Sequence, residues 1–210
     1  MIKKKIGRPS LSPEQKELIR NEIINIARDL FINDGYENTS MRKIAAKAGF
    51  APTKIYYYFE NKKEILKHFW DDIATELYQF TTPPKDYKNA PLKSLRYIMQ
   101  RSVDYWINNP KSYQLGIATQ DFPIHQEESF NINDTSASIN YLQLIRDNAQ
   151  ACIDQKIFPG KDSLMVSKII SVSIYGIYGS FYNLPSIDWD ERELLVKLAI
   201  DNTLLGLQYE

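Results

Sequence analysis

The chain has 210 residues, enough to bury a sizeable core, and its formal net charge is zero at neutral pH. Its single cysteine, Cys152, and its two widely separated histidines exclude an internal disulfide and a cysteine-based metal site. The basic start MIKKKIGRPS runs into SLSPEQKE without an apolar stretch, which argues against a secretory signal. We therefore expect a cytoplasmic protein without a metal or other cofactor.

The charge is divided unevenly along the chain. Residues 1–68 hold 14 Lys and Arg against 8 Asp and Glu, or +6, whereas residues 69–210 hold 12 against 18, or −6. Such a division suggests a basic module for a polyanion joined to an acidic body with another task. Chance clustering of surface charge is the open alternative.

The first helix is expected to begin with a capping box. Ser12 is the N-cap, Pro13 takes the first helical position and Gln15 completes the box. Gly35 ends the helix. The apolar residues at helical spacing between these points are Ile19, Ile23, Ile26, Ala27, Leu30 and Phe31.

Three further helices are expected before residue 82. Thr39 or Ser40 caps a short helix, Gly49 supplies the positive φ of a tight turn, and another short helix begins at Pro52. Asn61 caps a longer fourth helix, which ends before Thr81-Thr82-Pro83-Pro84. The proline pair marks a domain boundary.

The rest of the chain repeats the helical pattern. Helices are expected near 91–108, 111–121, 135–157, 162–184 and 190–208, and no alternating β pattern of useful length interrupts them. The prediction is an all-α fold with a basic arm over 1–16, a small helical domain over 17–77 and a larger helical domain over 78–210.

One uncharged run, Ile169 to Ile187, has 19 residues and must be weighed as a membrane span. Its serines, its glycines and Asn183 are too polar for a span, and Pro185 shortens it. We therefore expect a buried helix or part of a dimer interface, and no membrane partner.

The second helix, its glycine turn and the third helix form a helix-turn-helix, in which the later helix enters the major groove of DNA. Hydroxyls and free backbone N–H groups at Thr39 and Ser40 suit a phosphate. Basic side chains surround the unit: Arg42, Lys43, Lys47, Lys54, Lys62 and Lys63.

These residues resemble the DNA-binding domain of the TetR family of bacterial transcriptional regulators, over roughly residues 17–77. The matching positions are Ala27, Phe31, Gly35, Tyr36, Thr39, Ser40, Ile44, Ala45, Ala48, Gly49, Tyr56, Tyr58, Phe59, Lys62 and Leu66. The resemblance implies that Tyr56 packs inward with Phe59, while Tyr57 and Tyr58 face the groove. Two positions depart from the family: Ala51 stands where serine is usual, and Thr53 stands where glycine is frequent.

The basic pattern and the resemblance together give the candidate DNA contacts. They are Arg8, Thr39, Ser40, Arg42, Lys43, Pro52, Thr53, Lys54, Tyr57, Tyr58 and Lys62. Tyr58 and Lys62 are expected on phosphates, while base readout by Lys54 or Tyr57 is left open. Arg8 belongs either to a minor-groove arm or to an ordinary disordered tail.

The stretches NNPKSYQLGIATQDFP and SVSIYGIYGSFYNL resemble the effector domains of one subgroup of the same family. The candidate ligand-binding residues are Tyr105, Trp106, Tyr113, Phe122, His125, Tyr141, Tyr175 and Tyr178; ordinary core packing is the alternative for each. The candidate dimer-interface residues are Val172, Gly176, Gly179, Asn183, Leu195, Leu198, Asn202 and Leu205; these stripes also fit the core of a monomer.

The function expected from these patterns is a dimeric repressor that leaves a palindromic double-stranded operator when a small-molecule effector binds. The alternative is a helical interaction protein or ligand-binding module without sequence-specific DNA binding. No catalytic pattern of the Ser-His-Asp, paired-carboxylate or phosphate-loop kind stands out, so we expect no enzyme and no catalytic residue.

Overall fold

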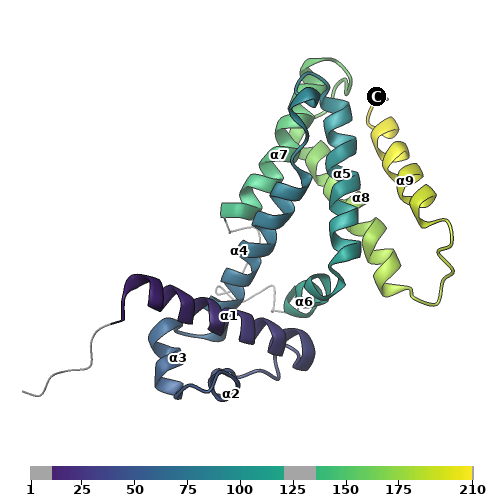
Figure 1. Ribbon diagram of the computed structural model, residues 1–210. Helices are drawn as coiled ribbons and strands as arrows, with labels where there is room; N and C mark the ends of the chain where they lie inside the picture. The colour runs from purple at the N-terminus through teal and green to yellow at the C-terminus, as the bar shows by residue number, and fades with distance from the viewer. Residues whose placement is uncertain (1–10, 121–135, 210) are drawn as a thin grey trace, which may run out of the picture. The chain divides into compact units, whose positions relative to one another are not determined.

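The computed structural model describes residues 11–120 and 136–209, and within them every long element is a helix (Figure 1). This confirms the all-α prediction for the described residues. The helices are α1 (Pro13–Asp34), α2 (Met41–Lys47), α3 (Pro52–Tyr58), α4 (Lys62–Thr81), the short 3-10 helix η1 (Lys85–Tyr87), α5 (Pro91–Asn108), α6 (Pro110–Gln120), α7 (Ser136–Asp154), α8 (Ser163–Asn183) and α9 (Arg192–Gly206).

Local capping explains where the first helices begin and end. Ser12 Oγ accepts from the N–H of Gln15 at 3.2 Å, and the Gln15 side chain accepts from the N–H of Ser12 at 3.0 Å, which is the predicted capping box. Gly35 and Gly49 have φ of 84° and 67°, as the turn predictions require. Asn61 caps α4, since its Oδ1 accepts from the N–H of Glu64 at 2.9 Å.

The chain divides into two compact units, which we call the N-terminal unit (Met1–Phe69) and the C-terminal unit (Trp70–Glu210). The division lies inside α4. The domain boundary expected near residue 77 stays a prediction.

The core of the N-terminal unit is formed by apolar side chains at helical spacing. The fully or almost fully buried ones are Ile23, Ala27, Phe31, Ile44, Ala45, Ile55, Phe59, Ile65 and Leu66. In this unit α1 packs on α2, and α2 packs on α3 (Figure 1).

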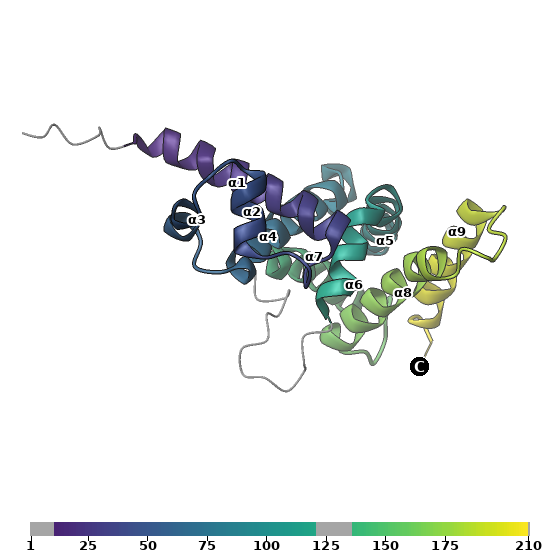
Figure 2. The same ribbon diagram turned by 90° about the horizontal axis from the view of Figure 1, so that it is seen from below.

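In the C-terminal unit α5 is the central helix, since it packs on α7, α8 and α9. Its buried face carries Leu95, Ile98, Met99 and Val103. Arg96 on α5 and Asp201 on α9 form an ion pair. Figure 2 shows α8 and α9 side by side, as their mutual packing also indicates.

Helix α8 is long and apolar enough to cross a membrane by length and composition, with a mean hydropathy of 1.4 in its most apolar window. One third of that window, 33%, is buried inside the protein. The buried part, which includes Val166, Ile170 and Ile174, faces the other helices of the C-terminal unit. Burial inside a bundle thus accounts for part of the apolar character of α8, and an exposed face accounts for the rest.

Candidate nucleic-acid interface and ligand cavity

The helix-turn-helix is built from α2, the turn around Gly49 and α3. Ser40 caps α2, because its Oγ accepts from the N–H of Lys43 at 3.2 Å. The turn is closed by the N–H of Phe50, which donates to the carbonyl of Ala45 at 2.9 Å. The positive φ of Gly49 lets the chain reverse here without strain. Helix α3 is thereby held against α2.

Helix α3 begins without a side-chain cap, as Ala51 at the N-cap position requires. Pro52 takes the first turn, and both Pro52 and Thr53 are exposed. The ammonium of Lys54 lies 3.3 Å from the centre of the Phe50 ring. Lys54 therefore packs on the turn by a cation–π contact in the protein without DNA.

The three consecutive tyrosines do not face the directions that the sequence predicted. Tyr56 and Tyr57 are 54% and 67% exposed, whereas Tyr58 is half-buried and its hydroxyl is buried without a hydrogen-bond partner among the described residues. The prediction that Tyr56 packs inward and Tyr58 faces outward is therefore wrong. Ile55 is the fully buried residue of α3, and Tyr58, three residues later, lies on the same side of the helix.

Thr39 is also misassigned as an exposed phosphate contact. It is 1% exposed, and its hydroxyl donates to the carbonyl of Gly35 at 2.9 Å. The hydroxyl thus satisfies the C-terminal end of α1. Ser40 and Arg42 are exposed and remain available at the start of α2.

Two of the predicted basic contacts have partners within the N-terminal unit. Lys43 pairs with Asp34 at 3.0 Å. Lys62 donates to the carbonyl of Tyr36 at 2.9 Å, lies 4.1 Å from the centre of the Tyr36 ring and pairs with Glu37 at 3.5 Å. Burial raises the pKa of Tyr36 to about 12, so this phenol is neutral at physiological pH. Lys62 therefore joins the start of α4 to the loop after α1.

Replacing Lys62 by methionine is expected to lower the free energy of unfolding by about 1 to 2 kcal/mol, because a charged donor to the Tyr36 carbonyl is lost. The exposed pair with Glu37 contributes little to this value. Urea unfolding followed by far-ultraviolet circular dichroism measures it. Lys47→Met, on the exposed side of α2, is the control and should change the free energy by less than about 0.5 kcal/mol. Equal stabilities for the two variants would contradict this structural role of Lys62.

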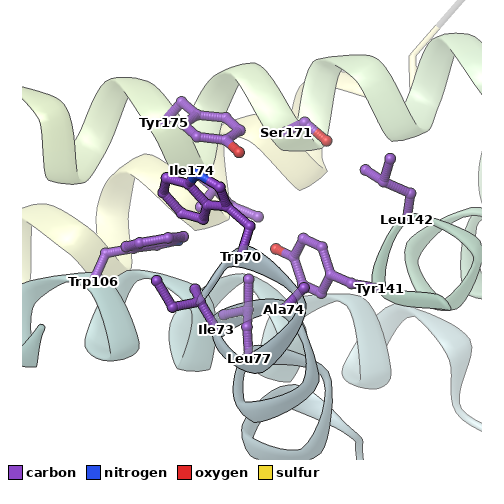
Figure 3. A pocket seen from close by; sticks show the side chains of 10 residues that line it. All are labelled: Trp70, Ile73, Ala74, Leu77, Trp106, Tyr141, Leu142, Ser171, Ile174 and Tyr175. Carbon is purple, nitrogen blue, oxygen red and sulfur yellow. The ribbon is translucent and has the colours of Figure 1, made fainter. Parts of the chain in front are cut away.

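A cavity lies within the C-terminal unit, between α4, α5, α7 and α8 (Figure 3). Its volume is about 50 Å³. The residues that line it are Trp70, Ile73, Ala74, Leu77, Trp106, Tyr141, Leu142, Ser171, Ile174 and Tyr175.

Three of the predicted ligand-binding residues line this cavity: Trp106, Tyr141 and Tyr175. No ligand contact was predicted on α4 from the sequence, although Trp70, Ile73 and Leu77 form one stripe of that helix and all line the cavity. The signal that could have found this part of the lining is Trp70, a large aromatic residue on the same stripe.

The other predicted ligand-binding residues lie elsewhere. Tyr105 donates to Glu76 at 3.0 Å. Tyr113 and Tyr178 form an edge-to-face pair at 4.6 Å, and Trp106 stacks on Tyr178 at 5.6 Å. The rings of Tyr105, Tyr113 and Tyr178 do not line the cavity, whereas that of Trp106 does. Phe122 and His125, like Arg8 of the basic arm, lie outside the described residues.

Helices α8 and α9 share an exposed apolar face, which we call the α8–α9 face. Val172 is 71% exposed, and Leu195, Leu198 and Leu205 are 40%, 47% and 48% exposed. Gly176 and Asn202 are exposed too, and a Cβ on Gly176 would have no neighbour within 4 Å. A groove of about 470 Å³ crosses this face, with Ile177, Phe181 and Leu195 in its wall.

Gly179 does not belong to this face. It is buried, and a Cβ there would come within 3.0 Å of the Tyr113 hydroxyl. The amide of Asn183 also reaches that hydroxyl, at 3.3 Å. The prediction that Gly179 lies at a dimer interface is therefore wrong, because the residue allows α6 and α8 to approach within one subunit.

Residues 23–69 match the family model described as bacterial regulatory proteins of the tetR family. The chain is similar to the TetC protein of transposon Tn10 from Escherichia coli, with 30% identity over 90 residues, which are 43% of this chain and 45% of that protein. It is also similar to the transcriptional repressor KstR2 of Mycolicibacterium smegmatis, with 25% identity over 93 residues, 44% of this chain and 45% of that protein. The match thus spans a little under half the length of these relatives.

Solved structures extend the similarity of fold to most of the chain. A TetR transcription regulator from Haloarcula marismortui has a TM-score of 0.71 at 15% identity, covering 91% of this chain and 98% of that one. The SmeT–triclosan complex has a TM-score of 0.69 at 18% identity, covering 90% and 91%. At these identities the likeness shows the fold alone.

Proposed function

We propose that this chain, a member of the tetR family of bacterial regulatory proteins, is a dimeric transcriptional repressor that a small-molecule effector releases from a palindromic operator. The observation that carries the proposal is the exposed face of α3, where Thr53, Tyr56 and Tyr57 point away from the core. Tyr56 and Tyr57 are the most exposed aromatic side chains among the described residues of the N-terminal unit, and the Tyr57 ring meets the Tyr58 ring edge-on at 5.1 Å.

The exposed side of α2 and α3 has groups suited to both the phosphates and the bases of DNA. Arg42 and the capped start of α2 at Ser40 offer a cation and N–H groups to phosphates. We assign Tyr57 or Lys54 on α3 to base edges in the major groove, and Lys54 has to leave the Phe50 ring to reach them. Tyr56 takes the outward position that the sequence had assigned to Tyr58.

A second copy of the chain supplies the second helix-turn-helix. The α8–α9 face exposes four large aliphatic side chains, and burying them against the same face of another subunit gives a two-fold dimer. Such a dimer reads two half-sites about 34 to 36 Å apart. The protein acts in the cytoplasm, where its DNA lies.

The cavity is the proposed effector site. It lies in the C-terminal unit, which begins inside α4. The recognition helix α3 ends at Tyr58, shortly before α4 begins. A ligand that binds one conformation of this unit more tightly than another shifts the population of DNA-competent dimers. The structure of SmeT, which has a similar fold, is a complex with triclosan.

Selection of bound duplexes from a random library tests the proposal. We expect an enriched palindrome that binds at least about 10³-fold more tightly than random DNA, with an affinity that falls steeply as salt rises. Equal affinity for selected and random duplexes would contradict it and would favour a helical ligand-binding or interaction protein.

Two variants then distinguish a phosphate contact from a base contact. Arg42→Ala should weaken binding to all duplexes by a similar factor, whereas Lys54→Ala should change the preferred base at one position of each half-site, with a loss of about 1 to 3 kcal/mol. Repeating the selection with each variant measures both effects. An unchanged consensus for Lys54→Ala would remove this residue from base readout.

A further inference from the structure

The described wall of the cavity is aromatic and aliphatic. It consists of two indoles, two phenols and four larger aliphatic side chains, together with Ala74 and Ser171. None of these described residues carries a charge. Burial raises the pKa of the Tyr141 and Tyr175 hydroxyls, so both are neutral at physiological pH. An ionised ligand would lose its hydration here without gaining an opposite charge.

The size of the cavity limits the ligand. A water molecule needs about 10 to 15 Å³ of such space and a cavity of about 150 Å³ accepts benzene, so the volume of about 50 Å³ holds a few waters and admits one six-membered ring only when the wall moves outward. The indoles of Trp70 and Trp106 both line the cavity (Figure 3), and a flat aromatic ring can stack on such a surface. A ligand larger than one ring requires a larger movement of the wall.

The hydrogen bonds around Tyr141 decide which polar group a ligand can direct at the Tyr141 hydroxyl. Ser102 has one hydroxyl hydrogen and donates it to the carbonyl of Ile98 at 2.7 Å. The contact of 2.8 Å between Ser102 Oγ and Tyr141 Oη is therefore donated by Tyr141. Tyr141 has then used its only hydrogen, and its oxygen can only accept.

The hydroxyl of Ser171 has also used its only hydrogen. It donates to the carbonyl of Ser167 at 2.9 Å, so toward the cavity it also offers only an acceptor. Figure 3 shows the hydroxyl of Tyr141 directed into the space between the helices. Tyr175, which can donate or accept, is compatible with either kind of ligand.

We infer that the cavity takes an uncharged, single-ring aromatic ligand that donates a hydrogen bond to Tyr141 Oη, as a phenol does. The inference rests on the proposed effector role of this cavity and specifies its ligand class. The ring of the ligand contacts the indoles of Trp70 and Trp106, and its donor group binds Tyr141 Oη. Tyr141 in turn donates to Ser102 Oγ, and Ser102 donates to the carbonyl of Ile98.

Calorimetric titration of the full chain with five small probes tests the inference without DNA. Para-cresol should bind about 3- to 10-fold more tightly than toluene, which has no polar group, and than para-methylanisole, which can only accept. Benzoate and benzylammonium should bind more weakly than para-cresol at neutral pH. Equal binding of para-cresol and toluene, tighter binding of either ion, or no binding of para-cresol would overturn the inference.

Two variants identify the acceptor. Tyr141→Phe should remove the preference for para-cresol over toluene, while Tyr97→Phe, which removes a hydroxyl that does not line the cavity, should keep it. Ser102→Ala leaves the Tyr141 hydroxyl free to donate, so para-methylanisole should gain affinity relative to para-cresol. An unchanged order of affinities in both Tyr141→Phe and Ser102→Ala would show that Tyr141 does not select the ligand.

The operator affinity is measured separately. If para-cresol binds with the expected preference but leaves operator affinity unchanged, the ligand class stands and the effector role fails. If the operator is bound specifically and para-cresol does not bind, the ligand class fails and the DNA-binding proposal stands.

Discussion

Replacing Phe59 by alanine is expected to lower the free energy of unfolding of the N-terminal unit by about 3 to 5 kcal/mol. Phe59 is 1% exposed at the end of α3, the guanidinium of Arg20 lies 4.7 Å from its ring centre, and the ring of His68 meets it edge-on at 5.9 Å. The loss combines the missing apolar burial with the cavity left behind. Since small domains are stable by only about 5 to 15 kcal/mol, this loss removes a large share of the stability of the unit.

The chain offers a way to follow the two units separately. All three tryptophans, Trp70, Trp106 and Trp189, belong to the C-terminal unit, whereas circular dichroism reports helices in both. In Phe59→Ala, part of the helical signal should be lost at lower urea concentration while the tryptophan fluorescence transition moves little.

Tyr57→Ala is the matched control, because Tyr57 is an aromatic residue of the same helix with 67% exposure. It should unfold like the unaltered protein and lose operator affinity instead. Coincident transitions for Phe59→Ala and the unaltered chain would show that Phe59 does not hold α3 and α4 on α1.

Replacing Val172 by glutamate should raise the dissociation constant of the dimer by about 100-fold or more. Val172 is the most exposed large apolar side chain of the described residues, at 71%, and lies on the α8–α9 face. In a two-fold interface each substitution occurs twice, so two carboxylates are buried without partners, each at a cost of several kcal/mol. Each 1.4 kcal/mol corresponds to a tenfold change in the constant.

Sedimentation equilibrium over a range of protein concentrations measures this constant. Leu18→Glu is the control, because Leu18 on α1 is 70% exposed but lies outside the proposed interface; it should leave the dimer intact. Circular dichroism should show that Val172→Glu keeps its helices. A monomeric unaltered chain, or a Val172→Glu dimer of normal strength, would exclude the α8–α9 face as the interface.

Local features of this protein could be predicted from its sequence because they depend on residues close together in the chain. The Ser12–Gln15 capping box, the glycine turn at Gly49 and the cap at Asn61 each involve residues no more than a few positions apart. The helical pattern after residue 90 follows from apolar spacing alone. The short helices and the glycine turn indicated the helix-turn-helix, and the family was indicated by the resemblance of residues 17–77 to its DNA-binding domain.

The directions of individual side chains were decided by tertiary packing. Thr39 was expected to face a phosphate, yet the end of α1 offered its hydroxyl a carbonyl acceptor at Gly35. Tyr58 turned inward because it shares a side of α3 with Ile55, and Tyr56 was left exposed. A seven-residue helix contains too few positions for its own periodicity to select between these tyrosines.

The cavity and the α8–α9 face depend still more on the assembled helices. The lining of the cavity comes from four helices that are distant in sequence, so Trp70 could not be joined to Tyr141 by any spacing rule. Gly176 and Gly179 look equivalent in the sequence, but one is open to solvent and the other lies under the Tyr113 hydroxyl. Three residues along a helix turn a side chain by about 300°, and only the position of α6 determines which of the two glycines it covers.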